Sequence, residues 1–458
     1  MVHPFAGKPL LQWPLDALRA VGARPLVAVV GPRSDDGVAE LRSLCGDDVE
    51  FAVQRQKKGT GHAVLAARSR MAGYRGPVLV MAGDLPLLRP RTLRRLVRAQ
   101  KQTGDGIALL CATVDEPHGW GRIVRRGRRV GAIVEQRDAT AEQRAIREVN
   151  VGVYCLRASL LFDLLPKIKP DNAQGELYLT DIIELALARG ARVSSVAVDP
   201  GEVGQVNSRR ELAALEAVVR RQINDRWMAA GVSLGDPATT YIDPDVRIGR
   251  DTVIGPNVHL RGATRIGAGC QIDGSSFLTD SRVGDGVHLR FGVVMTETRV
   301  GKRCLIGPFA HLRPGSRLAD DVHIGDFVET KNASLAAGAK ANHLAYLGDT
   351  EIGRQTNIGA GTITCNYDGF AKHRTVIGDR VMIGSDTQLV APVRVGDDVY
   401  VASGTTVLRD VPPGSLVFNP RRQSERSGWV AERRRREAKK VKTVVKAQKG
   451  VKARTRKG

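Results

Sequence analysis

Aromatic residues and cysteines are scarce in this chain of 458 residues. Aromatics make up 4% of it, and the six cysteines lie far apart with no C-x-x-C pair. This spacing predicts reduced thiols in a cytoplasmic protein and implies no zinc site. The chain also has no run of about 18 apolar residues and no charged-then-apolar leader, so we expect neither a membrane span nor a secretion signal.

Acidic residues are outnumbered by basic ones, and the formal net charge is +22. Residues 431–458 contain 13 Lys and Arg against 2 Glu, which is half of this excess. We expect this low-complexity tail to be disordered and solvated rather than to bind nucleic acid, because it has no aromatic residue for base stacking. RNA binding that depends steeply on salt and is lost on deleting the tail would favour the opposite interpretation. The moderately basic body fits anionic small molecules such as nucleotides, sugar phosphates or coenzyme A.

The second half of the chain repeats every six residues. An aliphatic residue marks each repeat, commonly with glycine after it, as at Ile248-Gly249, Ile254-Gly255 and Ile266-Gly267. Helices and free strands have periods of 3.6 and 2, so a period of six predicts a parallel β-helix with the aliphatic side chain inside. The glycine is expected at a corner that would strain a larger residue. Left-handed β-helices of this kind, which break the usual crossover rule, mostly carry acyltransferases.

Four segments follow from these patterns. Residues 1–207 alternate apolar strands with helical stretches, which predicts an α/β domain with a mostly parallel sheet. Residues 208–230 are a predicted linker helix, with a capping box of Ser208 and Glu211 at its start and Gly231 after its end. Residues 231–430 form the β-helix domain, and 431–458 the tail. Three interruptions of the repeat, near 273–283, at 330–351 and at 364–376, are where sites are expected.

Several longer motifs carry a resemblance to a known family. They are GTGHA at 59–63, GDLPL at 83–87, GWGRI at 119–123, LRPG at 312–315, HLAYLGD at 343–349 and NIGAGTITCNYDG at 357–369. The chain resembles the bacterial bifunctional enzymes that join N-acetylglucosamine-1-phosphate uridylyltransferase to glucosamine-1-phosphate N-acetyltransferase. The resemblance runs from His3 to about Trp429. It implies a Rossmann-like nucleotidyltransferase domain, a left-handed β-helix, a homotrimer formed through the β-helix, and Mg²⁺, UTP and acetyl-CoA as cofactor and co-substrates.

Acetylating the amino sugar needs a base for the ammonium, cations for the phosphate and donors for the oxyanion. A neutral imidazole suits the base role, and the resemblance makes His343 that base. It implies sugar-phosphate contacts from Arg313, Lys331, Tyr346 and Asn357, and acetyl-CoA contacts from Ala360, Asn366, Tyr367, Ser385, Ser403 and Arg421. Arg421 or Arg422 stands where the family usually has a Ser-Arg pair. Taken alone, Arg313 and His343 are typical of structural residues; their place inside matched motifs favours function.

Uridylyl transfer is mainly positioning and charge neutralisation by Mg²⁺. Asp84 follows a buried strand, which places its carboxylate at the edge of the sheet where ligands bind. The resemblance pairs Asp84 with Asn207 as Mg²⁺ ligands. It also implies UTP or sugar contacts from Gln54, Gly59, Thr60, Gly121, Glu135, Asn150 and Asn207. Alone, Asp84 could cap a helix and Glu135 could be a solvated charge.

The family's opening segment has no counterpart in this sequence. Members begin with a buried strand, a loop of the form L-x-x-G-x-G-T-R-M that wraps the nucleotide phosphates, and a Pro-Lys pair. Met1 to Pro4 align just after that pair. Either the start codon lies further upstream or the chain is truncated. A single-activity acetyltransferase with a degenerate N-terminal domain is therefore an alternative function, and a non-catalytic binding protein on the same folds is a second.

For the chain as written, we expect a sheet without its first, central strand. Buried unpaired backbone groups cost about 1–3 kcal/mol each, against a total stability of about 5–15 kcal/mol. A purified protein that starts at Met1 is therefore expected to acetylate glucosamine-1-phosphate but to make no UDP-sugar. Normal release of pyrophosphate from UTP would contradict this expectation.

Overall fold

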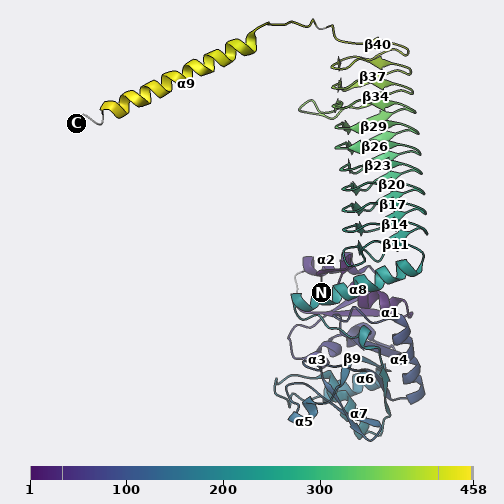
Figure 1. The fold of residues 1–458 in the computed structure, drawn as a ribbon. Coiled ribbons are helices and arrows are strands. Elements are labelled where there is room, and N and C mark those ends of the chain that lie inside the picture. Colours follow the sequence, from purple (N-terminus) through teal and green to yellow (C-terminus); the bar gives the residue numbers. More distant parts are fainter. Residues whose placement is uncertain (1, 33–34, 421, 455–458) are drawn as a thin grey trace.

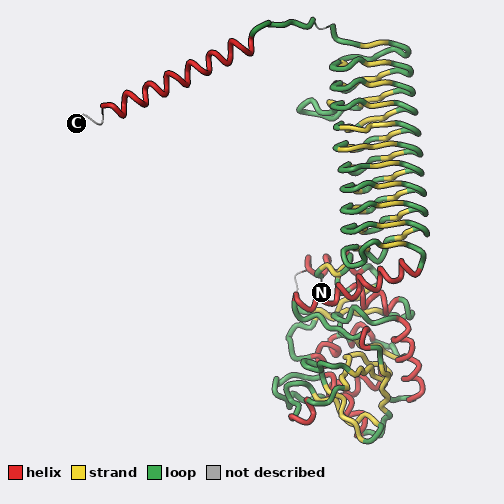
Figure 2. The backbone as a smooth tube through the Cα atoms, viewed as in Figure 1, coloured by secondary structure: helices red, strands yellow, loops and turns green. Residues whose placement is uncertain are grey.

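The computed structural model describes residues 2–32, 35–420 and 422–454. An α/β domain lies at one end of a tall β-solenoid, and a long helix extends from the solenoid's other end (Figure 1). The tube in Figure 2 shows the solenoid as regularly stacked coils, with one loop standing out from the stack. None of the described helices combines the length and apolar character needed to cross a bilayer.

The α/β domain has these elements in chain order: β1 (Pro4–Phe5), β2 (Lys8–Pro9), α1 (Gln12–Arg19), β3 (Leu26–Val30), α2 (Asp35–Cys45), β4 (Val49–Val53), α3 (Thr60–Ala66), β5 (Pro77–Met81), α4 (Pro90–Thr103), β6 (Ile107–Thr113), β7 (Arg122–Arg126), β8 (Arg129–Val134), α5 (Ala141–Arg144), β9 (Glu148–Arg157), α6 (Ala158–Leu164), α7 (Ile182–Ala188) and β10 (Val193–Ala197). The four predicted strands correspond to β3, β5, β6 and β9. The Rossmann-like fold class is confirmed.

The prediction of a mostly parallel sheet is wrong in one respect. The main sheet has the order β10-β6-β9-β7-β8, with β5 also on β9, and β9 runs antiparallel to both β5 and β6. β9 follows the β7–β8 hairpin rather than a helical crossover, so no crossover holds it parallel to its neighbours.

The N-terminal strands form a separate sheet, as expected for a domain without its central strand. β3 pairs in parallel with β4 alone, and β5 pairs with β9 alone. Among the described residues no strand occupies the second edge of either β3 or β5. The two free edges border a common cavity, and this gap separates the β3–β4 pair from the main sheet.

Helix α8 (Arg209–Ala229) links the domains with the predicted ends. The Ser208 side chain accepts from the Glu211 amide, Glu211 reaches back to the Ser208 amide, and Gly231 follows the helix with a φ of 93°. Trp227 is buried against the first coils of the solenoid. The Asn224 amide donates to the Pro237 and Thr240 carbonyls, which fastens the helix to the first coil.

The solenoid runs from β11 (Ser233–Leu234) to β40 (Leu416–Val417), and its strands stack into three parallel sheets. The predicted aliphatic positions are all inside. They are Ile248, Ile254, Leu260, Ile266, Ile272, Ile306, Leu312, Leu318, Ile324, Ile352, Ile358, Ile377, Ile383, Leu389, Val395 and Val401. The parallel β-helix prediction is therefore confirmed.

The glycines after the aliphatic residues have a different physical reason from the predicted one. Gly255 and Gly267 do not have a positive φ. A Cβ on Gly255 would lie 2.1 Å from the Asp273 carbonyl oxygen of the next coil, so close stacking of coils excludes a side chain there. The corners with positive φ are at other residues, including Asp251 and Asn257.

The three predicted interruptions differ in kind. Arg247 pairs with Arg265, eighteen residues later, whereas Arg265 pairs with Arg282, seventeen residues later. The first interruption is thus a coil shortened by one residue, and coils in the second are shortened in the same way. Only the third adds chain: Thr350 pairs with Thr375, and the extra residues form the loop that stands out in Figure 2.

The tail is helical rather than disordered, which corrects the prediction for 431–458 as far as residue 454. Helix α9 spans Trp429–Arg454. Its first turns contain strong helix formers, and Glu432–Arg436 and Glu437–Arg433 pairs lie one turn apart at 3.1 and 3.6 Å. Residues 455–458 lie outside the described residues.

Candidate functional site

The predicted base His343 ends β29 (Lys340–His343), directly above Asp326 at the end of β26 (His323–Asp326). Its Nδ1 lies 3.2 Å from Asp326 Oδ1. A proton on Nδ1 would be held by that carboxylate, which leaves Nε2 free to accept one. The imidazole is 64% exposed, so a substrate can reach it.

Three cations gather beside this pair. Arg313 donates to Glu329 at 2.7 Å, and Lys331 ends β27 (Glu329–Lys331), one strand along the same sheet. Contact with the Lys372 ammonium, together with the charges of Lys372 and Arg313, lowers the pKa of Lys331. Like charges crowded in this way are typical of a site for a multiply charged anion, which would relieve their repulsion.

Lys372 belongs to the inserted loop, and internal bonds fix its position. Tyr367 and Lys372 form an antiparallel bridge. The Asp368 carboxylate accepts from the Phe370 and Ala371 amides and from His373 Nε2 at 2.7 to 2.8 Å. These bonds, backbone amides first, lower the pKa of Asp368 well below its usual range. The loop is a tight hairpin that holds its lysine against the neighbouring coil.

The remaining sugar and acetyl-CoA residues follow the coil stacking. Tyr346 stacks on Glu329 in the adjoining strand, and Asn357 stacks on Lys340. Ala360, Ser385 and Ser403 form one column, since the Ala360 carbonyl accepts from Asp386 and the Ser385 carbonyl from Gly404. These residues therefore lie on consecutive coils, as a site for a long ligand requires.

Asn366 and Tyr367 begin the inserted loop. Asn366 is buried and donates to Asp349 at 2.5 Å, while Tyr367 is 61% exposed. Burial alone would raise the pKa of Asp349, but hydrogen bonds from Asn332 and Asn366 and two nearby lysines lower it. Arg421 lies outside the described residues, so its predicted role stays a prediction.

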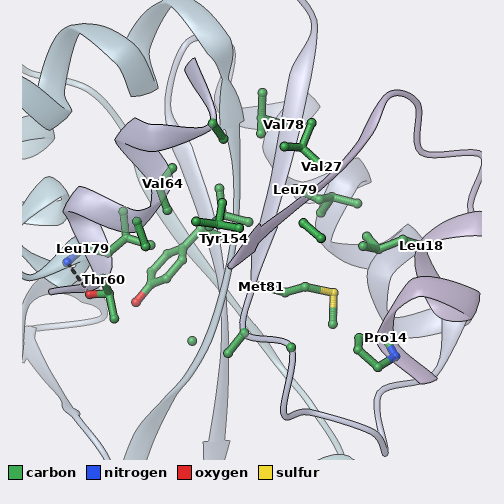
Figure 3. Close-up of a pocket in the computed structure, with 18 of the residues that line it drawn as sticks. Pro14, Leu18, Val27, Thr60, Val64, Val78, Leu79, Met81, Tyr154 and Leu179 are labelled. Carbon is green, nitrogen blue, oxygen red and sulfur yellow. Dashed lines mark hydrogen bonds between the residues drawn. The ribbon is translucent and has the colours of Figure 1, made fainter. Parts of the chain in front are cut away.

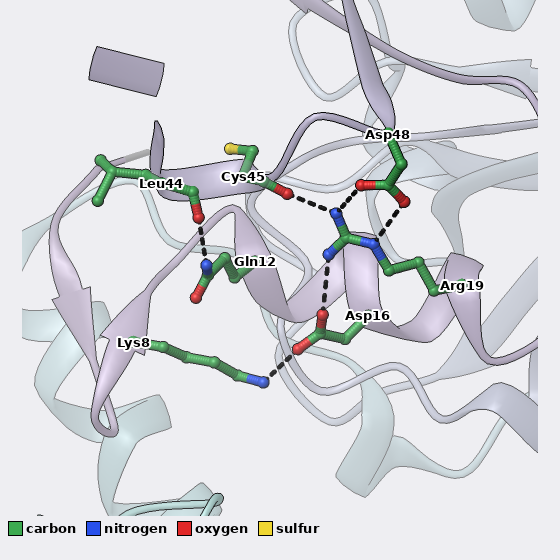
Figure 4. A network of polar contacts seen from close by, with 7 residues as sticks. All are labelled: Lys8, Gln12, Asp16, Arg19, Leu44, Cys45 and Asp48. Atoms are coloured by element: carbon green, nitrogen blue, oxygen red, sulfur yellow. Dashed lines mark hydrogen bonds and ion pairs between the residues drawn. The ribbon is translucent and has the colours of Figure 1, made fainter. Parts of the chain in front are cut away.

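The uridylyltransferase residues gather around a cavity of about 800 Å³ in the α/β domain. Thr60, Gly121, Glu135 and Asn150 line it together (Figure 3 shows Thr60 and part of the lining). Gln54 and Gly59 lie beside Thr60, and the Gln54 amide donates to the Gly59 carbonyl at 3.0 Å. This cluster matches the nucleotide and sugar contacts expected from the sequence.

Asp84 has the properties of a magnesium ligand. It comes directly after Gly83 of the cavity wall, and its Oδ1 is buried without a hydrogen-bond partner. Burial raises its pKa, which a hydrogen bond from Gln205 partly opposes. A buried, unpartnered carboxylate oxygen suits Mg²⁺, which needs only one or two protein ligands beside phosphate and water. Asn207, the second predicted ligand, is exposed two residues beyond Gln205.

Comparisons with known proteins agree with this geometry. Residues 1–153 match the MobA-like NTP transferase domain, 237–311 the GMPPB C-terminal domain and 374–409 the bacterial transferase hexapeptide repeats. The protein named bifunctional protein GlmU from Pelobacter propionicus is 48% identical over 431 residues, which are 94% of this chain and 93% of the relative. Its namesake from Geobacter sulfurreducens is 46% identical, with 95% of each chain covered.

The chain belongs to the GlmU family. A third relative of the same name, from Anaeromyxobacter, is 47% identical over 95% of this chain and 89% of its own length. The two halves of the chain, an NTP transferase domain and a hexapeptide solenoid, thus correspond to the two parts of a bifunctional GlmU protein.

Sequence reasoning missed several residues of these GlmU sites. Asp326, Glu329, Asp349 and Lys372 contact predicted residues but stand outside or between the recognised stretches. The eighteen-residue coil length was the available signal for Asp326, because it places that carboxylate one coil before His343. No sequence signal would have placed Lys372, since the inserted loop has no repeat phase.

Removal of the Lys372 charge tests the three-cation site. Lys372→Ala is expected to raise the KM for glucosamine-1-phosphate about tenfold, with kcat little changed, because a charge-assisted hydrogen bond contributes about 1.5–3 kcal/mol. Lys372→Arg, which keeps the charge, is the matched control in the same acetyltransferase assay. An unchanged KM in the alanine variant would contradict the assignment.

Asp181 gives a pH-dependent prediction. Burial first, and then Glu184, Glu135 and Asp138, raise its pKa to about 6. A carboxyl with a raised folded-state pKa favours folding below its unfolded pKa and loses that contribution as the pH rises through about 4 to 6. Asp181→Asn should therefore stabilise the protein near neutral pH by on the order of 1 kcal/mol after solvent screening, and have no such effect near pH 4. Urea unfolding at both pH values measures this, and equal effects at both would contradict it.

Proposed function

We propose that this protein makes UDP-N-acetylglucosamine, a bacterial cell-wall precursor, in two reactions. The solenoid transfers an acetyl group from acetyl-CoA to the amine of glucosamine-1-phosphate, and the α/β domain then transfers uridylyl from UTP to the product. The observation that carries this proposal is the pairing of two separate sites in one chain: His343 with three cations on the solenoid, and Asp84 at the cavity.

The acetyl transfer follows from the geometry around His343. Asp326 holds a proton on Nδ1, so Nε2 takes the proton that the sugar amine loses as it attacks the thioester carbon. The C–N bond forms and the C–S bond breaks, and coenzyme A leaves as the thiol after protonation. Arg313, Lys331 and Lys372 hold the sugar phosphate and so fix the amine relative to the imidazole.

In the α/β domain the chain's own residues position the reactants. Asp84, with Asn207, would hold Mg²⁺, which supplies charge neutralisation at the phosphates when bound. Gln54, Gly59 and Thr60 are placed to hold the base, and the Leu179 amide fixes the Thr60 hydroxyl at 2.9 Å. Glu135 and Asn150 hold the sugar; Asn150 is itself oriented by the Tyr154 hydroxyl at 2.7 Å.

We also propose a homotrimer formed through the β-helix. Three exposed aromatic rings lie in one column on consecutive coils: Phe291, Phe309 and Phe327, with centroids 5.5 and 5.6 Å apart. Contiguous exposed apolar surface of this kind is typical of a subunit interface. A cytoplasmic location fits the cysteines, all of which are free thiols in the structure.

Bifunctional relatives along nearly the whole chain favour the two-reaction function over a single-activity acetyltransferase. Retention of His343, Arg313 and Lys331 with Asp84 and Asn207 also argues against a non-catalytic binding protein.

Two substitutions separate the sites. His343→Ala is expected to lower kcat for acetyl transfer by about 10²–10⁴, the usual contribution of a general base, and to leave Mn²⁺ binding at the cavity unchanged. Asp84→Asn should do the reverse, weakening binding of Mn²⁺, used as a probe for Mg²⁺, with acetyl transfer intact.

Acetyl transfer is measured by thiol release, and Mn²⁺ binding by paramagnetic resonance. Undiminished acetyl transfer by the His343→Ala variant would overturn the proposal for the solenoid. Full Mn²⁺ binding by the Asp84→Asn variant would overturn it for the α/β domain.

A further inference from the structure

The cavity of the α/β domain is also a slot between two strands. Every residue of β3 and every residue of β5 lines it, which is unusual for a pocket bordered by strands of one layer. Leu18 of α1 borders it on one side and Val64 of α3 on the other, as Figure 3 shows. The slot therefore lies in the plane of the sheet, between a layer of helix on either face.

Both walls of the slot present unused backbone groups. The Val30 carbonyl accepts from the Gln54 amide after β4, and the directions of backbone groups alternate along a strand, so Val27 and Val29 face the slot. On the other wall, the Gly76 carbonyl accepts from Ala158 after β9. Leu79 and Met81 consequently point their amides and carbonyls away from β9 and into the slot.

The space matches one more strand in length and polarity. β3 and β5 are five residues long each, so the slot extends over roughly 17 Å at about 3.3 Å per residue. Its helical sides are apolar, with Pro14, Leu18 and Val64 among the lining residues. An occupant must therefore offer hydrogen-bonding groups along both edges and apolar groups on both faces, and only an extended apolar peptide does so.

We propose that this slot binds one extended apolar peptide segment, which adds as a strand between β3 and β5. The segment joins the β3–β4 pair to the main sheet, and its side chains alternate between the layer of α1 and the layer of α3. The slot continues into the part of the cavity lined by Thr60 and Glu135, so the end of the bound strand lies next to the residues assigned to uridylyl transfer. Binding itself does not depend on that assignment.

The test uses a synthetic heptapeptide of alternating Val and Ile with a short Lys tag, added to the full chain. Hydrogen exchange is followed residue by residue. We expect the amides of Val27, Val29, Leu79 and Met81 to exchange at least about tenfold more slowly with the peptide bound. The amides of β6, which already pairs on both edges, serve as the internal reference. A peptide of the same sequence with alternate amides N-methylated is the control, and it should give no protection.

Matched variants separate strand pairing from simple apolar contact. Leu79→Pro removes one slot-facing amide without touching the bonds to β9, and proline is tolerated on a free strand edge. Leu79→Ala removes the same side chain but keeps the amide. We expect the proline variant to bind the heptapeptide at least about tenfold more weakly than the alanine variant. Val27→Pro and Val27→Ala repeat the comparison on β3, and retained acetyl transfer shows that the variants fold.

Three results would overturn the proposal. One is the absence of peptide binding at millimolar concentration. Another is binding that protects no slot-facing amide, which would make the slot a pocket for small apolar molecules. The third is equal loss of affinity in the proline and alanine variants at both positions, which would show that backbone pairing contributes nothing.

Discussion

The stacking of one coil on the next, through parallel backbone hydrogen bonds, determines where every functional group of the solenoid lies. Its register is nearly constant, so a side chain is carried above the residue seventeen or eighteen positions earlier. This is why Asp326 lies under His343. Close stacking also explains the glycines, since a Cβ at Gly255 would meet the carbonyl of the next coil. The catalytic geometry is therefore a consequence of the repeat length.

Much of this arrangement could be predicted from the sequence, and the reason is its period. Ile254 and Leu260 are buried where a six-residue repeat puts them. Features outside the repeat were harder to anticipate. The direction of β9 depends on a hairpin that precedes it, and the position of Lys372 depends on local bonds from Asp368. The tail was expected to be disordered on composition alone, although its Glu and Arg spacing also supports a helix.

The α/β domain shows the opposite situation, in which a regular pattern is incomplete. β3 and β5 each leave one edge unpaired inside the domain, although buried backbone groups normally find partners. At about 1–3 kcal/mol for each unsatisfied group, four slot-facing residues represent a substantial part of the stability of a domain. The two domains of this chain thus differ in how fully their backbone bonds are satisfied.

The inserted hairpin around Lys372 has one more consequence. The chain leaves the solenoid after β33 (Ile363–Cys365) and returns at β34 (Thr375–Ile377) in the same sheet order, with the coils above and below undisturbed. Its shape is maintained by its own internal bonds. A longer or shorter hairpin could therefore be exchanged at this point as an independent module, altering which acceptor is chosen while the scaffold below keeps its alignment.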